Sequence, residues 1–150
     1  MRIETSRFGA VEVDENRFIR FEHGILGFPN DKEFALIQTA EGSGFYWLQA
    51  VTRADLAFVV CDPRFFVPDY RAPIKTEELA QVGLEDPAGA QVFIIVNKVD
   101  DLLTGNLQGP LVINHHSRAA KQLVLSDKRY STRHPLMRLH RRETVASKIA

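Results

Sequence analysis

In the stretch Thr104-Gly-Asn-Leu-Gln-Gly-Pro-Leu-Val-Ile-Asn114, turn residues stand directly before a short apolar run. Its glycines and Asn106 suit a turn or bulge, where a positive φ or a close backbone approach is needed. Pro110 has no backbone N–H to donate, so it fits the start or the edge of a strand formed by Leu111-Val-Ile113. A second short strand is predicted at Gln122-Leu-Val-Leu125. The stretch therefore predicts a β-hairpin with a mainly architectural role.

Other segments around this hairpin also have strand character. Two runs, Leu56–Cys61 and Val92–Val96, are apolar at every position, so both faces of these strands should be covered. The remaining predicted strands alternate apolar and polar residues or are rich in aromatic residues, and they span Arg2–Thr5, Ala10–Val13, Arg17–Glu22, Phe34–Gln38 and Phe45–Val51.

A helix is predicted at one place only, from Thr76 to Val82. Thr76 suits the N-cap position, and Gly83 suits the position after the C-cap. Leu79 and Val82 give the helix a narrow apolar stripe that can cover part of a sheet. Parallel strands need long crossover connections, which are usually helical, and the chain has one candidate for such a helix. The predicted fold is therefore mainly β, an antiparallel barrel-like or two-sheet body with one short helix.

The composition indicates a single domain of 150 residues that needs no disulfide. The one cysteine, Cys61, lies within an apolar run and is predicted to be buried. The first residues carry no apolar signal segment, and no apolar run approaches the roughly 18 residues that span a bilayer. These features predict a cytoplasmic protein without a membrane-spanning segment.

The net charge of zero hides an asymmetry along the chain. Residues 1–110 hold 10 Lys or Arg against 17 Asp or Glu, a net charge of −7, and residues 111–150 hold 9 against 2, a net charge of +7. Two oppositely charged regions of one small domain can simply face each other or water. The alternative is that the basic region contacts an acidic partner such as RNA.

The sequence offers no recognisable catalytic or metal-binding motif. Asn97-Lys-Val-Asp100 resembles the guanine-recognition element of GTPases, but no glycine-rich phosphate loop precedes it, so we interpret it as a polar strand end. The five histidines include one adjacent pair, His115 and His116, whose side chains would point to opposite faces of a strand. We predict no enzyme activity, no cofactor and no metal ion.

The loop His23–Pro29 keeps apolar side chains within a glycine-rich segment. Exposure of Ile25, Leu26 and Phe28 together would create an adhesive patch on the surface. We predict that the loop folds back and plugs one end of the core, with a contact surface as the alternative.

Several blocks along residues 1–136 resemble, in order, the signature of the bacterial flagellar assembly factor FliW family. The blocks are Ile25-x-Gly27-Phe28-Pro29, Trp47-Leu48-Gln49, Phe58-x-x-x-Asp62-Pro63-x-x-Phe66-x-x-Asp69-Tyr70, and Thr104-x-Asn106-Leu107-x-x-Pro110-x-Val112-Ile113-Asn114, followed by Gln122-x-Val124-Leu125 and Tyr130-x-x-Arg133. Two positions depart from the pattern, which has Ala at Gly105 and Gly at Ala120.

This resemblance implies a regulatory binding protein. FliW-like proteins bind flagellin in the cytoplasm and, when flagellin is depleted, bind the translational regulator CsrA, which relieves its repression of flagellin mRNA. The resemblance implies one β domain over residues 1–136, which we expect to be monomeric when free. Residues 137–150 are basic and end without a firm period, so we expect them to form a frayed tail. The alternative function is a direct RNA-binding module that uses the basic C-terminal region.

The predicted partner contact is the apolar, proline-rich loop that follows Cys61. Its candidate binding residues are Phe65, Phe66, Asp69 and Tyr70. Aromatic side chains often anchor protein interfaces, and the alternative is that these aromatic residues belong to the core.

Overall fold

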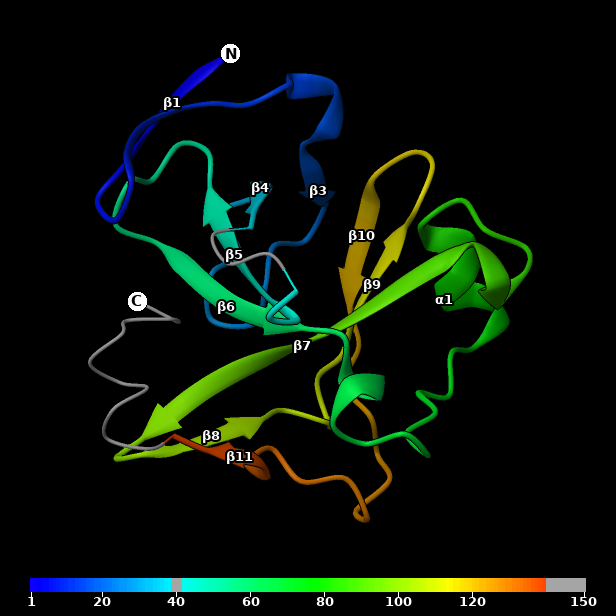
Figure 1. Cartoon of the computed structure of the whole chain (residues 1–150). Coiled ribbons are helices and arrows are strands. Elements are labelled where there is room, and N and C mark those ends of the chain that lie inside the picture. The colour runs from blue at the N-terminus through cyan, green and yellow to red at the C-terminus, as the bar shows by residue number, and fades with distance from the viewer. Residues whose placement is uncertain (39–41, 140–150) are drawn as a thin grey trace.

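Seven strands close into a barrel in the computed structural model, which describes residues 1–38 and 42–139 (Figure 1). The hydrogen-bonded order is β7, β6, β5, β4, β3, β10, β9 and back to β7. All of these neighbours are antiparallel except β3 and β10, which pair in parallel. The bounds are β3 (Ile19–Phe21), β4 (Glu33–Ile37), β5 (Phe45–Ala50), β6 (Ala57–Cys61), β7 (Ala90–Val99), β9 (Leu111–Asn114) and β10 (Ala119–Gln122). The predicted mainly β, barrel-like class is confirmed.

Strand β7 closes the barrel because it is long enough to serve two neighbours along one edge. Its first residues, Ala90–Phe93, pair with β9, and its last residues, Val96–Val99, pair with β8. Strands β8 (Leu102–Gly105) and β11 (His134–Arg138) continue the sheet beyond the barrel. The Asn97-to-Asp100 segment forms the end of β7 and the turn into β8, which confirms a polar strand end.

A two-stranded hairpin of β1 (Arg2–Thr5) and β2 (Gly9–Glu12) lies against the barrel, as the alternating pattern predicts. Phe8 in its turn packs edge-on against Trp47 with 5.9 Å between ring centroids. The Arg7 guanidinium lies 4.1 Å from the centre of the Trp47 ring. A short 3₁₀ helix, η1 (Glu15–Arg17), then leads into β3.

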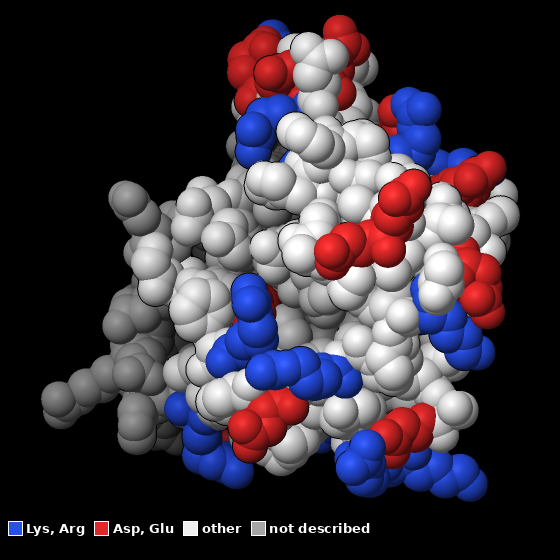
Figure 2. Space-filling view, turned by 90° about the vertical axis from the view of Figure 1, so that its right-hand side faces the viewer, with Lys and Arg blue, Asp and Glu red and all other residues white. Residues whose placement is uncertain are grey.

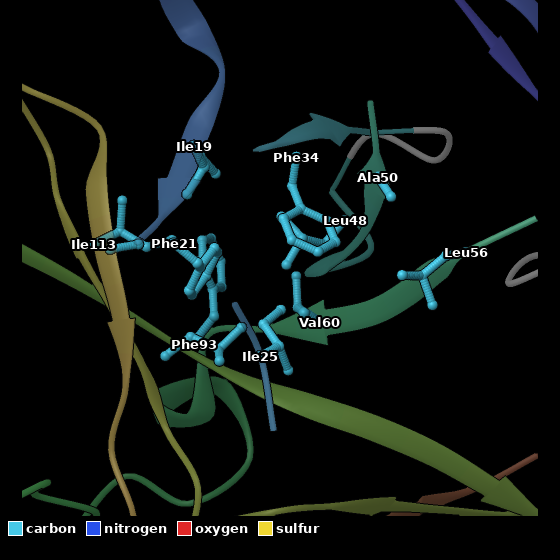
Figure 3. Close-up of a cluster of buried hydrophobic side chains, with 12 residues drawn as sticks. Ile19, Phe21, Ile25, Phe34, Leu48, Ala50, Leu56, Val60, Phe93 and Ile113 are labelled. Carbon is cyan, nitrogen blue, oxygen red and sulfur yellow. The ribbon is translucent and has the colours of Figure 1, made fainter. Parts of the chain in front are cut away.

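The apolar side chains gather in three clusters, and the largest fills the barrel (Figure 3). Phe93 of β7 points into this interior cluster, whereas Ile94 belongs to a second cluster under β8 and β11. Val112 of β9 packs in a third cluster beside the helix, whereas its neighbours Leu111 and Ile113 face the interior. Val60 and Cys61 of β6 likewise lie in the interior and the second cluster, so both predicted apolar runs, Leu56–Cys61 and Val92–Val96, have side chains packed on both faces.

The helix α1 spans Thr76–Gln81, and its N-cap is Lys75 rather than the predicted Thr76. The reason is that the Glu78 carboxylate accepts a hydrogen bond from the Lys75 backbone N–H at 2.9 Å, which starts the helix one residue earlier. Leu79 and Val82 are buried, which confirms the predicted apolar stripe. Gly83 follows the C-cap with φ +77°, as its position in the sequence predicts.

The hairpin of the central stretch is confirmed, with a shifted second strand. Strand β10 is formed by Ala119–Gln122, earlier than the predicted Gln122–Leu125, and Ala120 pairs with Ile113. Asn106 organises the turn before β9, because its Oδ1 accepts hydrogen bonds from the N–H groups of Gln108 and Gly109 at 3.0 and 2.9 Å. These contacts are those of an architectural segment.

The loop from His23 to Pro29 folds back on the barrel as predicted. Ile25 is buried in the interior cluster, and Phe28 packs edge-on against Phe58 at 5.4 Å. Leu26 is the exception, with 77% of its surface exposed. Only two of the three apolar side chains therefore serve as the plug.

Cys61 is buried, and burial raises the pKa of its thiol to about 12. No helix among the described residues is both long and apolar enough to cross a membrane. The predicted frayed tail starts at residue 137. That residue lies inside β11, which runs to Arg138, and the next residue, Leu139, is buried. The rest of that tail, residues 140–150, lies outside the described residues.

Candidate partner-binding site

The connection from β6 to α1 turns sharply as soon as the strand ends. Asp62 caps the 3₁₀ helix η2 (Pro63–Phe65), because its Oδ1 accepts a hydrogen bond from the Arg64 N–H at 2.9 Å. The Arg64 guanidinium also forms an ion pair with Asp62 at 2.7 Å. Burial of Asp62 opposes its ionisation, but hydrogen bonds from Arg64 and Gln91 outweigh this effect and lower the pKa of the carboxyl.

The structure separates the four candidate contact residues into different environments. Phe65 is 72% exposed, and Asp69 is exposed as well. Phe66 is half-buried and stacks on Phe45 with 5.4 Å between ring centroids. Tyr70 is 4% exposed, and its hydroxyl donates a hydrogen bond to the Leu107 carbonyl at 2.7 Å. Tyr70 is therefore a core residue, and Phe65 is the aromatic side chain that the loop presents to solvent.

A groove of about 390 Å³ lies beside this loop, between η2, the segment before α1 and the start of β7. Its walls include the apolar side chains of Ile74 and Val92, and its rim carries Arg64 and Arg71. The Arg71 Nη1 donates hydrogen bonds to the carbonyls of Pro68 and Tyr70 at 3.2 and 2.9 Å. The groove thus combines an apolar wall with the Asp62–Arg64 ion pair and the guanidinium of Arg71 at its edge.

The edge of β7 that borders this groove lacks a strand partner. Pairing between β6 and β7 ends at Cys61 and Ile94, so Ala90–Phe93 have no strand on the β6 side among the residues described. The Gln91 side chain covers part of the edge by donating to the Val92 carbonyl at 3.1 Å. An unpaired edge beside an apolar groove is the kind of surface to which partner segments bind.

Sequence reasoning located the loop but missed Arg64, Arg71 and the strand edge. One signal for the edge was present. Pro63, directly after Asp62, ends β6. The apolar run of β7 continues beyond Ile94, the partner of Cys61, so the edge of β7 beyond that pair is left without pairing to β6.

Charges of both signs are interspersed on the face shown in Figure 2. Acidic side chains gather at its top, at the level of β1 and η1 in Figure 1. Two basic residues of the C-terminal region are neutralised locally, since Arg129 pairs with Asp127 and Arg138 pairs with Asp101. Within residues 1–38 and 42–139, no three His, Cys, Asp or Glu side chains gather in a way that would hold a metal ion.

Comparison with known proteins identifies the relatives of this chain. The model of the family described as FliW protein matches residues 2–136. The flagellar assembly factor FliW of Heliobacterium modesticaldum is 41% identical over 91% of this chain and 90% of its own length, and that of Leptospira biflexa is 37% identical over 87% and 88%. A solved structure described as the flagellar assembly factor FliW superimposes with a TM-score of 0.84 at 34% identity, over 91% of this chain and 97% of that one.

Proposed function

The chain belongs to the FliW family, whose relatives are named flagellar assembly factors rather than enzymes, and from this premise we propose that it binds flagellin in the cytoplasm. When flagellin is depleted, the protein binds the translational regulator CsrA instead and relieves repression of flagellin mRNA. Such a switch is a competition between two protein partners, so it requires differential binding and no covalent chemistry.

The observation that carries this proposal is the exposed Phe65 beside the groove. An exposed phenylalanine gains free energy by leaving water, and aromatic residues commonly dominate the energy of protein interfaces. Arg71 at the rim can pair with a carboxylate of a partner, whereas Arg64 is already paired with Asp62. We therefore propose that flagellin contacts Phe65 and the groove, together with Asp69 and the half-buried Phe66 of the same loop.

Phe65→Ala is expected to weaken binding of a terminal helical segment of flagellin at least about tenfold, because the anchor side chain is lost. Stability should hardly change, since Phe65 is mostly exposed. Isothermal titration calorimetry with a synthetic flagellin peptide measures the affinity, and a urea melt measures the stability.

Val124→Ala is the matched control, because Val124 is also an apolar residue with 72% of its surface exposed but lies after β10, outside the loop that carries Phe65. It should leave the flagellin affinity unchanged. Equal losses in both variants, or no loss in Phe65→Ala, would remove this loop from the flagellin site.

The charge distribution supports a basic protein partner over a direct RNA contact. Residues 1–110 carry a net charge of −7, which repels phosphate and attracts a basic RNA-binding protein such as CsrA. The described basic residues of the C-terminal region are partly paired with Asp101 and Asp127. These observations favour an effect on RNA that passes through CsrA.

The protein alone is expected not to shift a flagellin leader RNA in a gel assay at near-physiological salt. When it is added to a CsrA–RNA complex, the shifted band of that complex should disappear. The direct RNA-binding alternative predicts a shift by the protein alone that falls steeply with salt, by about 0.7 log units of affinity per log unit of salt for each phosphate contacted. Loss of such a shift in a folded Arg138→Ala, Arg141→Ala, Arg142→Ala triple variant would establish that alternative.

A further inference from the structure

One end of the barrel is hollow, at the end where β3, β5 and β10 begin and β4 and β9 finish. A cavity of about 250 Å³ opens there and adjoins a second of about 210 Å³. We call this region the barrel mouth, and the side chains that define it are Arg17, Tyr46, Phe93, Ile113, His115 and Arg118. It lies on the opposite face of β7 from the partner groove, because neighbouring side chains of a strand point to opposite faces.

The floor of the barrel mouth is apolar. Ile113 is buried in the interior cluster, and Phe93 beside it belongs to the same cluster (Figure 3). Tyr46 packs edge-on against Phe93 with 5.6 Å between ring centroids. An apolar cavity of about 150 Å³ is large enough to hold a benzene ring. The mouth, at about 250 Å³, therefore has room above this floor for a small aromatic or branched aliphatic group.

The rim of the barrel mouth carries two guanidinium groups. Arg118 is half-buried, and its Nε and Nη2 donate to the backbone carbonyl of Arg17 at 3.2 and 3.0 Å. Neither Arg17 nor Arg118 takes part in an ion pair with any carboxylate of the described residues. Asp62 is linked to the mouth through Gln91, whose Nε2 donates to the Asp62 Oδ2 at 3.4 Å, and the charge of Asp62 is paired with Arg64.

The charge of Arg118 is held in an unfavourable environment, whereas Arg17 is exposed. Burial of Arg118 lowers the pKa of its guanidinium, and the neighbouring charge of Arg17 lowers it further. Removal of a charged group from water is costly unless an opposite charge replaces the lost hydration. An anion bound between the two side chains would provide that compensation.

The backbone of Arg118 points to the same conclusion. Its φ is +69°, a left-handed conformation that an arginine side chain does not favour. The conformation is held by hydrogen bonds from the Arg118 N–H to the Asn114 carbonyl at 2.9 Å and from the Arg20 N–H to the Arg118 carbonyl at 3.0 Å. Backbone conformations of this kind cluster at ligand-binding sites, where they fix a functional side chain.

We propose that the barrel mouth binds a carboxylate attached to a small apolar group. The carboxylate is bound by Arg17 and Arg118, and the apolar group rests on Tyr46, Phe93 and Ile113. The ligand is either a free small acid or the C-terminal residue of a polypeptide, since both present the same chemistry.

The test is a titration of the full-length, ¹⁵N-labelled protein with benzoate, followed by two-dimensional NMR. We expect saturable shifts of the backbone resonances of Arg17, Tyr46, Phe93 and Arg118. Benzamide, which has the same shape without the charge, should shift them at least tenfold more weakly. Equal shifts with benzamide, or no localised shift with benzoate, would overturn the proposal.

Two variants test the role of the guanidinium groups. Arg118→Gly removes the charge and suits the positive φ, so the variant should fold and lose benzoate binding. Arg17→Gln should also weaken benzoate binding, and it leaves the residue with the positive φ, Arg118, unchanged. Arg133→Gln, at an exposed arginine outside the mouth, is the control and should bind as the unmodified protein does. Undiminished benzoate binding by both Arg118→Gly and Arg17→Gln contradicts the proposal.

A third arm separates the two sources of the carboxylate. It compares a tetrapeptide ending in Phe with a free C-terminus against the same peptide with an amidated C-terminus. Binding of the acid peptide, but not of the amide, assigns the mouth to polypeptide C-termini, whereas binding of benzoate alone assigns it to free small acids. If neither the acid peptide nor benzoate binds, the proposal is wrong.

Discussion

Gly24→Ala is expected to lower the free energy of unfolding by about 3 to 5 kcal/mol, combining a left-handed backbone with overpacking. Gly24 has φ +70°, and an added Cβ would lie 2.3 Å from the Phe28 carbonyl oxygen and 2.8 Å from the Pro29 Cα. Both are backbone atoms, so no side-chain rotation can relieve the clash. The loop would have to open, and Ile25, which it buries in the barrel, would lose its place.

Gly9→Ala is the matched control for this prediction. Gly9 has nearly the same φ, +68°, but an added Cβ there meets nothing within 4 Å. It should cost only the conformational penalty of about 1 to 2 kcal/mol. Urea unfolding followed by the fluorescence of Trp47, the one tryptophan of the chain, measures both variants. If the free energy of unfolding falls equally in the two variants, the close backbone approach at Gly24 does not contribute to stability.

The barrel was predictable because burial on two faces leaves a clear pattern in the sequence. Strands β6 and β7 are apolar at consecutive positions, since one face looks into the barrel and the other lies under η2, β8 and β11. Two boundaries of secondary-structure elements were equally predictable. Pro110 stands directly before β9, and Gly83 directly follows the C-cap of α1, as their backbone preferences require.

The parts that sequence reasoning missed depend on distant partners. Leu102–Gly105 is too short to show a strand period, and it is a strand because β7 and β11 flank it. The parallel pairing of β3 with β10 joins segments about 100 residues apart, and no local pattern encodes it. The shift of β10 toward the N-terminus follows from the tight turn after Asn114, which the apolar residues alone do not reveal.

The candidate site was predictable as a segment but not residue by residue. Phe65, Phe66 and Tyr70 are equally apolar in the sequence, yet one is exposed, one half-buried and one buried. In an irregular loop no period of 2 or 3.6 residues indicates which side chain faces the core. The buried position of Tyr70 depends on the Leu107 carbonyl, which lies 37 residues away in the sequence and accepts a hydrogen bond from the Tyr70 hydroxyl.

The left-handed conformation of Arg118 is a further feature that the sequence concealed. Residues with a positive φ are usually Gly, Asn or Asp. In the turn from Asn114 to Ala119 the residue with the positive φ is an arginine, so the sequence does not indicate it. Positions where local preference and structure disagree in this way are expected at functional or strained sites. This is why the barrel mouth, and not only the partner groove, merits an experimental test.

Asn114→Ala is expected to lower the free energy of unfolding by about 2 to 4 kcal/mol, because three buried or half-buried groups lose their partner. The Asn114 Nδ2 donates to the Val82 carbonyl at the end of α1 at 2.8 Å. Its Oδ1 accepts from the N–H groups of His116 and Ser117 at 2.9 and 3.1 Å. One side chain thus joins the helix to the turn between β9 and β10, and alanine removes both connections at once.

Asn106→Ala provides the comparison that isolates the helix connection. The Asn106 Oδ1 also accepts two backbone hydrogen bonds, from Gln108 and Gly109. The residue is half-buried, however, and its Nδ2 bonds to no other element within residues 1–38 and 42–139. Its loss should cost about 1 to 2 kcal/mol, because the freed N–H groups can reach water. Hydrogen exchange of the α1 amides adds a local readout: they should exchange faster in Asn114→Ala and at the normal rate in Asn106→Ala. Equal stability losses with unchanged exchange in α1 would mean that the Asn114-to-Val82 hydrogen bond does not hold the helix on the barrel, and that its apolar contacts with Val112 are sufficient.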